Sequence, residues 1–517
     1  MKFIILHTSD VHGYFTSKSF VEKDVMESHG LSRAKTYIEK IRRENSNVIY
    51  VDTGDLIQGS PLSSFYKEEN RASGNINAIN LLKPDALVLG NHDFNYGLSY
   101  LESAKNSSDA PILCANVENN SDKEIFDSPY KIIEIEDVRI GILGLVTQYI
   151  PHWEGEENIA GLKFNSALES AKKFVPILRN EENCDIVIVA YHGGFEKDLE
   201  TGEELEKQTG ENEGYALLNS GLDFDVLLTG HQHLMTSGVI DEKAYAQPGF
   251  AASNISEISF DFEKGEVKNL EAKLVDLKDY SPNEEMEEFL KNDMISVNEM
   301  LDKKAGTIEP SARIEDIMDA QINGHTFIDL INQIQMEALG ADIAATSIFN
   351  ENIRGLDRNV TMREIMASYP FNNTLMKVEI TGKELKEILE FNSLYFVLDG
   401  ESLIVNPKYK FPKNLIFNYD IYSGISYTYD YKNEPGNRIV SLIYKGKEVE
   451  DTDILQIALN SYRAGGGGDF PVLDSSQVIS ETNKEMPEII FDYIKEKEDV
   501  KIKDMPSIKI IGYKDYK

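Results

Sequence analysis

Short apolar runs separated by helical stretches are the feature that most restricts how this chain can fold. Six such runs, most of them rich in β-branched residues, occupy 3–6, 48–51, 86–89, 140–146, 186–190 and 226–229. Apolar residues at helical spacing lie between several of the runs, over 31–43 and over 166–178, where Ser166 and Glu169 form a capping-box pattern. This alternation predicts an α/β fold with a layered architecture and a largely internal sheet.

The length of the chain predicts two domains. Its 517 residues exceed the size at which a single hydrophobic core usually stops growing. We expect a first domain over 1–275 and a second over 313–517, with a linker region over 276–312. Within the linker, residues 283–304 have the pattern of one acidic amphipathic helix.

The second domain is also predicted to be α/β. Thr381 and Glu384 form a capping pattern for a helix that continues through Leu389. Strand-like runs occupy 427–431, 439–444 and 454–459. The tail, from about Val500, has short apolar runs and is expected to supply a closing strand.

The charge balance restricts the partners of the protein. The chain has 88 acidic and 52 basic residues, a formal net charge of −36. Such a charge repels polyanions, so a nucleic-acid polymer is not an expected partner. A small anionic substrate could bind only where metal ions or a local arginine pocket reverse the sign of the potential.

The sequence contains no stretch that approaches 18 consecutive apolar residues, so no membrane span is expected. If Met1 is the native start, no room is left for a signal peptide and the protein is expected in the cytoplasm. If a leader was removed, the expected compartment is extracytoplasmic, in the periplasm or cell wall.

Cys114 and Cys184 lie in or beside strand-like runs and are expected to be buried thiols without a disulfide.

Histidines are concentrated in the first half of the chain. Eight of the nine precede residue 234, and five of these eight fall in segments that follow apolar runs. The segments contain Asp10 and His12, Asp55, Asn91 and His92, His192, and His231 and His233. Because sites in α/β sheets form at the carboxyl ends of strands, we expect the five segments to converge on one crevice.

Several of these segments have the composition of a metal site. Asp10 and His12 are separated by one residue, so their side chains point the same way in an extended chain. A carboxylate and an imidazole on one face make half a metal site. Asp55 is expected on a tight turn after Gly54, where glycine allows the backbone to approach the site closely.

Each segment alone also has an ordinary structural explanation. A lone Gly-Asp pair is most often a turn, and a lone His-x-His pair most often binds no metal. His7 lies within a predicted strand and is expected to be a hydrogen-bonded core residue. His29, His152 and His325 have no partner motif and are expected to be structural or exposed. All five segments together, each at a strand end, favour a metal centre.

The order DxH…GD…GNHD…H…GHxH resembles the calcineurin-like metallophosphoesterase superfamily. The resemblance covers about residues 1–260 and implies a four-layer α/β/β/α sandwich with two metal ions. It assigns Asp10, His12 and His233 to one metal. It assigns Asn91, His192 and His231 to the other metal, and Asp55 bridges the two.

The ligand set and the resemblance together predict a phosphohydrolase. Mixed oxygen and imidazole ligands suit Mn, Zn, Co or Fe ions. Two such ions would lower the pKa of a shared water and hold the phosphoryl oxygens. His92 follows Asn91 directly and is expected to stabilise the transferring phosphoryl group or to protonate the leaving oxygen.

The C-terminal half resembles the 5′-nucleotidase C-terminal domain. The whole chain is similar to the branch that includes UDP-sugar hydrolases, 5′-nucleotidases and 2′,3′-cyclic-nucleotide 2′-phosphodiesterase/3′-nucleotidases, with motifs that favour the last of these. The resemblance implies that Phe371 and Tyr462 sandwich a nucleotide base. It also implies that Arg354, in the segment that begins at Asn350, contacts the substrate, and that the linker region 276–312 is a hinge.

One departure from the 5′-nucleotidase pattern concerns the partner of His92. Many 5′-nucleotidases have an aspartate where this chain has Asn95, and an amide cannot stabilise an imidazolium by charge. The expected function is therefore a 2′,3′-cyclic-nucleotide 2′-phosphodiesterase/3′-nucleotidase. The alternatives are a 5′-nucleotidase or UDP-sugar hydrolase and, from another class, a nucleotide-binding protein without turnover.

Overall fold

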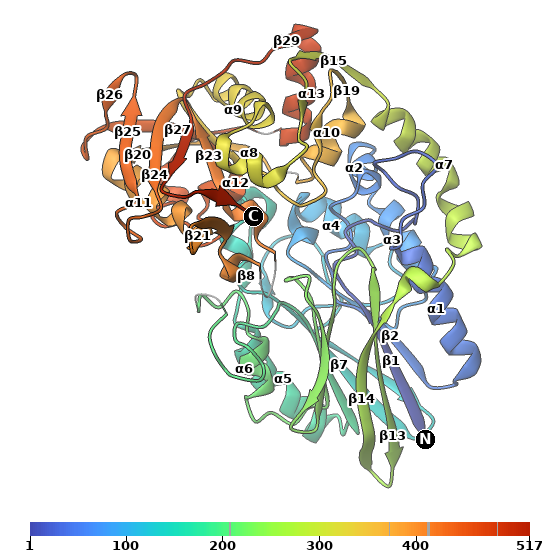
Figure 1. Cartoon of the computed structure of the whole chain (residues 1–517). Coiled ribbons are helices and arrows are strands. Elements are labelled where there is room, and N and C mark those ends of the chain that lie inside the picture. Colours follow the sequence, from blue (N-terminus) through green and yellow to red (C-terminus); the bar gives the residue numbers. More distant parts are fainter. Residues whose placement is uncertain (206–207, 372, 411–413, 483) are drawn as a thin grey trace. The chain divides into compact units, whose positions relative to one another are not determined.

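The fold is described from a computed structural model that covers residues 1–205, 208–371, 373–410, 414–482 and 484–517. The chain forms two compact units, Met1–Val297 and Asn298–Lys517 (Figure 1). Among the described residues, no helix is both long enough and apolar enough to cross a membrane. Cys114 and Cys184 are buried and free, as expected.

Two six-stranded sheets form the centre of the first unit. The first sheet has the order β14-β13-β1-β2-β3-β4 and the second β11-β12-β10-β9-β7-β6. The strands of the first are β1 (Lys2–Thr8), β2 (Val48–Asp52), β3 (Ala86–Val88), β4 (Ile112–Leu113), β13 (Asn254–Glu263) and β14 (Glu266–Asp276). Those of the second are β6 (Tyr130–Ile135), β7 (Val138–Val146), β9 (Ile186–His192), β10 (Val226–Thr229), β11 (Met235–Ile240) and β12 (Lys243–Pro248).

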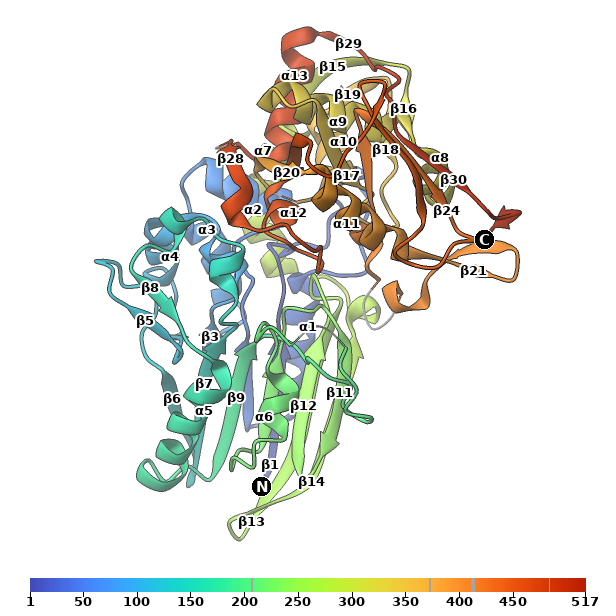
Figure 2. The ribbon, with the colours of Figure 1, turned by 90° about the vertical axis from the view of Figure 1, so that its left-hand side faces the viewer.

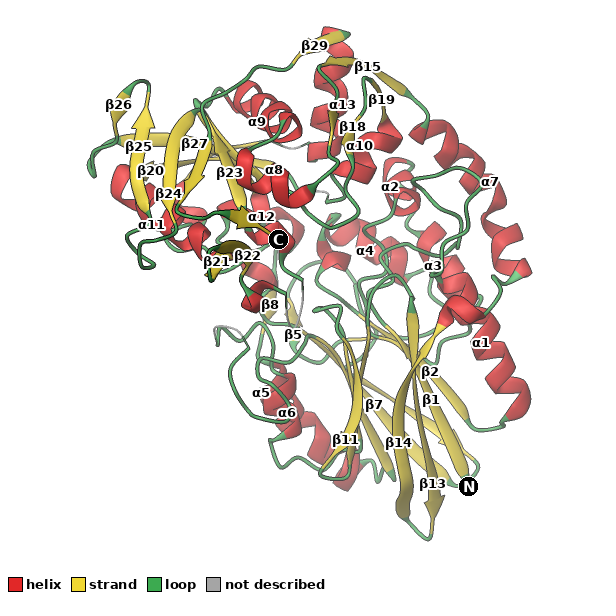
Figure 3. Ribbon diagram, viewed as in Figure 1, coloured by secondary structure: helices red, strands yellow, loops and turns green. Residues whose placement is uncertain are grey.

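The two sheets pack face to face, and helices cover their outer faces. Phe3 and Val51 of the first sheet share one buried core with Ile140 and Ile188 of the second. On the outer face of the second sheet, a separate buried core joins its strands to α5 (Ala167–Pro176) and α6 (Gly214–Leu218). Helix α1 (Leu31–Glu44) lies on the opposite side of the pair of sheets, which gives the expected α/β/β/α order of layers (Figure 3).

Parallel pairing brings several strand ends to one edge of each sheet. Strands β1, β2, β3 and β4 run parallel to one another, and so do β7, β9, β10 and β12. In each sheet, the loops that carry the candidate ligands therefore start at the carboxyl ends of parallel strands. These loops follow β1, β2, β3, β9 and β10. The remaining elements of this unit are α2 (Pro61–Glu68), α3 (Ser73–Asn80), α4 (Gly97–Lys105) and the pair β5 (Val117–Asn119) and β8 (Leu162–Phe164).

The helix expected over 283–304 is α7, which spans Glu284–Leu301. Glu284, Glu285 and Glu287 lie in its first turn, where carboxylates interact favourably with the positive end of the helix dipole. The helix begins in the first unit and ends in the second.

The second unit is built around a mixed five-stranded sheet. Its order is β23-β17-β27-β20-β28, and a four-stranded sheet has the order β26-β25-β24-β30. The strands of the first are β17 (Ile343–Ser347), β20 (Leu375–Thr381), β23 (Asp420–Ser423), β27 (Ile454–Asn460) and β28 (Val478–Glu481). Those of the second are β24 (Ile425–Asp430), β25 (Ile439–Tyr444), β26 (Lys447–Glu448) and β30 (Ile508–Ile511).

The C-terminal tail supplies strands, as expected. Strand β30 pairs parallel with β24, and the two lie side by side in Figure 2. The shorter strands of this unit are β15 (Lys304–Glu309), β16 (Ala312–Arg313), β18 (Gly355–Leu356), β19 (Asn359–Thr361), β21 (Phe396–Asp399), β22 (Ser402–Val405), β29 (Asp499–Lys501) and β31 (Asp515–Tyr516). Its helices are α8 (Ile317–Asn323), α9 (Thr326–Leu339), α10 (Met362–Ser368), α11 (Gly382–Asn392), α12 (Ser461–Ala464) and α13 (Met486–Lys497). Thr381 and Glu384 form the expected capping box at the start of α11.

Candidate metal centre

The predicted ligands of the first unit lie at the carboxyl ends of parallel strands. They are Asp10 and His12 after β1, Asp55 after β2, Asn91 after β3, His192 in β9, and His231 and His233 after β10. His192 was expected in a loop, but β9 continues two residues further than predicted and His192 is its last residue. Its ring is therefore held by the sheet itself.

The expectation that Asp10 and His12 lie in extended chain is wrong. Strand β1 ends at Thr8, and Asp10 and His12 have φ angles of 52° and 50°, in the left-handed region. Asp55, His231 and His233 also have positive φ, at 56°, 72° and 57°. Left-handed backbone is uncommon outside glycine and tends to gather at functional sites, where surrounding structure holds it in place. The tight turns aim these side chains inward.

Two glycines let the loops after β2 and β3 come into contact. A Cβ atom on Gly54 would lie 2.2 Å from the backbone nitrogen of Gly90. A Cβ atom on Gly90 would lie 2.2 Å from Oδ1 of Asp55. Any larger residue at either position would therefore push the two loops apart.

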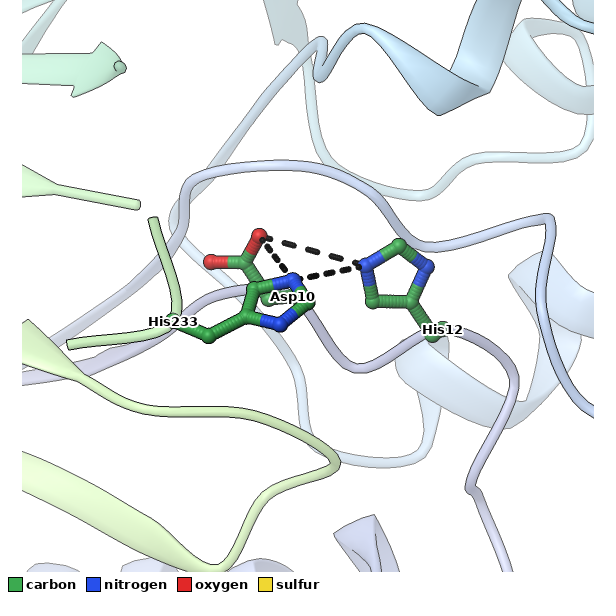
Figure 4. Close-up of side chains that lie close together, drawn as sticks. All are labelled: Asp10, His12 and His233. Atoms are coloured by element: carbon green, nitrogen blue, oxygen red, sulfur yellow. Dashed lines mark hydrogen bonds and ion pairs between the residues drawn. The ribbon is translucent and has the colours of Figure 1, made fainter. Parts of the chain in front are cut away.

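One cluster of donor atoms joins Asp10, His12 and His233 (Figure 4). Nε2 of His233 lies 3.4 Å from Oδ1 of Asp10 and 3.3 Å from Nε2 of His12. Nε2 of His12 lies 4.0 Å from the same Asp10 oxygen. These are the three residues that the resemblance assigns to one metal, and their donor atoms converge.

A second cluster is centred on Asp55, His192 and Asn91. Oδ2 of Asp55 lies 3.2 Å from Nε2 of His192 and 3.6 Å from Nε2 of His12, so it reaches both clusters. Oδ1 of Asn91 lies 3.0 Å from Nε2 of His192 and 2.8 Å from Nδ1 of His231. The structure thus brings all seven predicted ligands together.

The charges of the two clusters are strongly coupled. Burial alone would lower the pKa of His192, but the carboxylates of Asp55 and Asp10 raise it to about 10. Burial would raise the pKa of Asp55, yet the charges of His192 and His92 hold it well below its usual range. The imidazolium of His192 and the carboxylate of Asp55 therefore stabilise each other's charges.

This coupling predicts that metal binding releases a proton. A metal ligand must be deprotonated, and the ring of His192 is protonated at pH 7 because its pKa is about 10. We expect the apparent metal affinity to rise by up to ~tenfold per pH unit between pH 7 and 9, as one proton is displaced. Calorimetric titration with Mn²⁺ or Zn²⁺ in buffers of different ionisation enthalpy measures this proton. An affinity that does not change with pH, without proton release, would contradict the prediction.

Two of the candidate histidine ligands, His12 and His192, use their second ring nitrogen to contact a backbone carbonyl. Nδ1 of His12 lies 3.0 Å from the carbonyl oxygen of Gln58, and Nδ1 of His192 lies 2.6 Å from that of Thr53. These contacts leave Nε2 of both rings facing the clusters. Outer partners of this kind set the tautomer and the orientation of a ligating imidazole.

His231 has a carboxylate as its outer partner, a residue that the sequence did not indicate. Nε2 of His231 lies 2.9 Å from Oε1 of Glu211, while Nδ1 faces Asn91. The carbonyl oxygen of Glu211 accepts hydrogen bonds from the hydroxyl groups of Thr147 (2.6 Å) and Tyr191 (3.2 Å). Because Glu211 is 20 residues from His231 in a loop without a recognisable motif, no spacing pattern could have identified it.

Replacing Glu211 by Gln is expected to weaken metal binding by about 10–100-fold, the usual cost of losing an outer partner of a metal-binding histidine. The only tryptophan of the chain, Trp153, supplies the measurement, because its ring centroid lies 5.3 Å from that of His231. Quenching of its fluorescence by Mn²⁺ or Co²⁺ should report occupancy. Glu203→Gln, at an exposed position in the same loop, is the control. Equal affinities in the two variants would refute a role for Glu211.

The predicted catalytic residue His92 lies beside the clusters. Its backbone N–H donates to Oδ1 of Asp55 at 2.7 Å, and its ring meets that of His12 edge to face with centroids 5.3 Å apart. Nδ1 of His92 lies 2.8 Å from Oδ1 of Asn95. Asn95 is therefore the partner of His92 that the sequence left in doubt.

Asp93, the next residue, holds the loops of the centre together. Its carboxylate accepts backbone hydrogen bonds from Gly90 at 2.8 Å, Leu56 at 3.0 Å and Asp55 at 3.1 Å. Burial raises the pKa of this carboxyl, and the charge of Asp55 adds to the effect, while these N–H donors oppose it. Asp93 is thus a buried anchor between the loop after β2 and the loop after β3.

The remaining histidines have the structural or exposed positions expected of them. His7 is buried in β1, with Nε2 2.9 Å from Oγ1 of Thr53. His29 packs edge to face on Tyr14, and His152 is exposed. His325 caps α9, where its Nδ1 accepts from the backbone N–H of Phe327.

The predicted substrate residues of the second unit gather at one end of the five-stranded sheet. Strands β17 and β27 are parallel, so Asn350 and Tyr462 follow strands that end on the same side. Strand β20 is antiparallel to β27, with Leu375 opposite Asn460, so Phe371 precedes β20 at that same side. The topology therefore brings residues from three separate segments to one edge.

The surroundings of these residues differ. Phe371 is 42% exposed and packs edge to face on Phe349, with ring centroids 5.4 Å apart. Oδ1 of Asn350 accepts from the backbone N–H of Asn352, and Arg354 is exposed. Tyr462 is half-buried, with the backbone of Gly467 against its ring, where a Cβ atom would lie 2.6 Å away. Phe371 and Arg354 thus present side chains to solvent.

The donor set of the first unit fits two divalent cations. A carboxylate that reaches both clusters, a second carboxylate, an amide oxygen and four imidazoles make the mixed oxygen and nitrogen environment that Mn, Zn, Co or Fe ions accept. The close approach of donor atoms, such as the two Nε2 atoms of His12 and His233 at 3.3 Å, is the arrangement that a shared cation requires.

Comparisons with known proteins agree with this arrangement. Residues 3–235 match the calcineurin-like phosphoesterase family, and residues 304–475 match the 5′-nucleotidase C-terminal domain. The chain is 31% identical to a candidate 5′-nucleotidase of Staphylococcus aureus, whose structure was solved in complex with α-ketoglutarate. The TM-score is 0.91, and the match covers 99% of this chain and 100% of that one.

Two curated relatives are more distant. A 2′,3′-cyclic-nucleotide 2′-phosphodiesterase/3′-nucleotidase of Haemophilus influenzae is 27% identical over 95% of this chain and 84% of its own length. The trifunctional nucleotide phosphoesterase protein YfkN of Bacillus subtilis is 26% identical over 96% of this chain, which spans only 38% of that longer protein.

The fold and the centre define a metal-dependent phosphoester hydrolase with two metal ions. The catalytic unit is a calcineurin-like phosphoesterase, and the second unit is a 5′-nucleotidase C-terminal domain. The chain belongs to the 5′-nucleotidase family.

Proposed function

We propose that the protein releases phosphate from nucleotides as a 2′,3′-cyclic-nucleotide 2′-phosphodiesterase/3′-nucleotidase. The observation that carries the proposal is the convergence of seven oxygen and nitrogen donors around Asp55 in a chain whose curated relatives bear this name. Asn95, in place of the aspartate of many 5′-nucleotidases, favours the cyclic-nucleotide branch. A 5′-nucleotidase is the second candidate, because the Staphylococcus aureus relative carries that name.

In this proposal, Asp10, His12 and His233 hold one metal ion, and Asn91, His192 and His231 hold the other, with Asp55 between them. Bound divalent cations supply charge stabilisation at the phosphoryl oxygens and lower the pKa of water. Asp93 and the left-handed turns keep the ligands in position before substrate arrives. His92 protonates the oxygen that leaves phosphorus, so that the nucleoside departs as an alcohol.

The second unit is proposed to bind the nucleoside. Phe371 and Tyr462 would stack on the base, a contact that tolerates purines and pyrimidines alike because every base has a π face. Asn350 and Arg354 would contact the polar part of the substrate. Helix α7 is the proposed hinge between the two predicted domains, residues 1–275 and residues 313–517.

A small nucleotide fits the charge of the protein better than a polymer. With a formal net charge of −36, the protein as a whole repels a polyanion. A single phosphate can still bind where two divalent cations reverse the local charge. We therefore propose mononucleotides and not nucleic-acid chains as substrates.

The test is a panel of substrates assayed with the metal-reconstituted protein. It comprises 5′-AMP, 3′-AMP, 2′,3′-cyclic AMP, UDP-glucose and bis-p-nitrophenyl phosphate. Turnover of 2′,3′-cyclic AMP and 3′-AMP, in preference to the other nucleotides, is the expected result. Preference for 5′-AMP would select the second candidate, and no activity on any of the five would refute the nucleotidase proposal.

Replacing Phe371 or Tyr462 by Ala is expected to raise KM for nucleotides with little change in kcat. Stacking contributes about 1–3 kcal/mol per base, which corresponds to an increase in KM of about 5–150-fold. Steady-state kinetics on 3′-AMP measure the effect, and bis-p-nitrophenyl phosphate, which has no base, is the control substrate. Equal losses on both substrates would show that the two rings maintain the fold and do not bind a base.

A further inference from the structure

Glu154 lies directly behind Asn95, on the side opposite His92. Nδ2 of Asn95 donates a short hydrogen bond to Oε1 of Glu154, while Oδ1 of Asn95 lies 2.8 Å from Nδ1 of His92. We infer that Glu154 is a positioning residue, which sets the direction of the Asn95 amide and through it the proton position on His92. This inference rests on the proposed role of His92.

The chemistry of the three groups permits only one direction for the chain of hydrogen bonds. An ionised carboxylate only accepts, so the NH₂ group of Asn95 must face Glu154. The carbonyl oxygen of Asn95 then faces His92, and Nδ1 of the ring must carry a hydrogen to donate. Nε2 is left for the substrate, and a second proton on the ring must sit there. Without Glu154, nothing in this trio decides which end of the amide faces His92.

Glu154 is itself held in place from its other oxygen. Nδ2 of Asn158 donates to Oε2 of Glu154 at 3.0 Å and to the main-chain carbonyl oxygen of Asn95, also at 3.0 Å. Asn158 ends the short helix η3 (Glu156–Asn158), four residues after Glu154. Burial raises the pKa of the Glu154 carboxyl, and the hydrogen bond from Asn158 and the charge of His92 act against that rise. The segment around Glu154 thus reaches Asn95 through two independent contacts.

A correctly placed proton matters most for a leaving group that departs poorly. In the proposed reaction, water attacks phosphorus and loses a proton to solvent as the P–O bond to the nucleoside breaks. The nucleoside oxygen takes a proton from Nε2 of His92, and solvent returns a proton to that nitrogen. A p-nitrophenolate leaves without such help. If the amide of Asn95 were reversed, its NH₂ group would face Nδ1 and prevent that nitrogen from carrying a hydrogen. Nucleotide turnover should then suffer more than aryl phosphate turnover.

Exchanging the two groups gives a rescue experiment. Asn95→Asp alone places two carboxylates in contact. Glu154→Gln alone puts a donor against a donor unless the Asn95 amide reverses, and the reversed amide turns its NH₂ group toward His92. In the double variant N95D/E154Q, the amide of the new Gln donates to the new Asp and accepts from Asn158, so every contact has a partner again. The control is Glu156→Gln, which removes an exposed charge two residues away.

We expect kcat for 3′-AMP to fall at least about tenfold in both single variants. The upper limit is the ~10²–10⁴-fold that acid catalysis contributes in total. KM for 3′-AMP should change much less than kcat. The loss of kcat on bis-p-nitrophenyl phosphate should be much smaller than the loss on 3′-AMP. The double variant should recover most of the loss, and Glu156→Gln should keep wild-type kinetics. Additive losses in the double variant, or equal losses on both substrates, would overturn the inference.

The variant His92→Ala separates this inference from the function on which it rests. If His92→Ala keeps full activity on nucleotides, the proposed role of His92 fails. If His92→Ala is impaired while Glu154→Gln and Asn95→Asp are not, His92 acts without the help of Glu154, and only the inference fails.

Discussion

Replacing Asp55 by Asn should abolish phosphohydrolase activity. The carboxylate of Asp55 reaches His192 in one cluster and His12 in the other, so its charge serves both metal positions at once. We expect kcat to fall by more than the ~10²–10³-fold that the loss of one electrostatic stabiliser costs. Metal content, measured by mass spectrometry after dialysis, should fall together with activity.

Asparagine is the appropriate replacement because Asp55 has a φ of 56°, and asparagine tolerates this left-handed conformation. The matched control is Asp241→Asn, which changes an exposed aspartate with a φ of 47° in the turn between β11 and β12. The control should retain both metal ions and activity. If Asp55→Asn also retained both, Asp55 could not be the shared ligand.

Replacing His92 by Ala should lower kcat by about 10²–10⁴-fold, the range that general acid catalysis contributes. Metal content should not change, because the ring of His92 contacts Asn95 and His12 from outside the ligand clusters. We expect kcat and kcat/KM for 3′-AMP to fall equally, as they do when an interaction made only in the transition state is removed.

The control for this variant is His152→Ala, because His152 is exposed and stacks on Tyr149. It should keep the kinetics of the wild-type enzyme. A His92→Ala variant with wild-type kcat would show that proton transfer at this position is not needed. A variant that loses metal would instead place His92 among the ligands.

Much of the fold and of the metal centre could be predicted from short patterns. The runs at 226–229 and 439–444 coincide with β10 and β25, because β-branched residues bounded by turn signals leave few alternatives. The positions of Asp55 and His233 near a common centre followed from the rule that parallel strands present their carboxyl ends at one edge. The capping box at Thr381 needed only two residues three apart.

The sequence by itself determined several of the strands, the side chains that follow them and the charges that could bind a metal, because these depend on residues close together in the chain. The tertiary structure alone decided that Asp10 and His12 turn through left-handed backbone, and that Glu211 and Glu154 lie behind His231 and Asn95. Contacts across 20 or 59 residues leave no periodic trace in a sequence. They arise only when packing brings two loops to the same place.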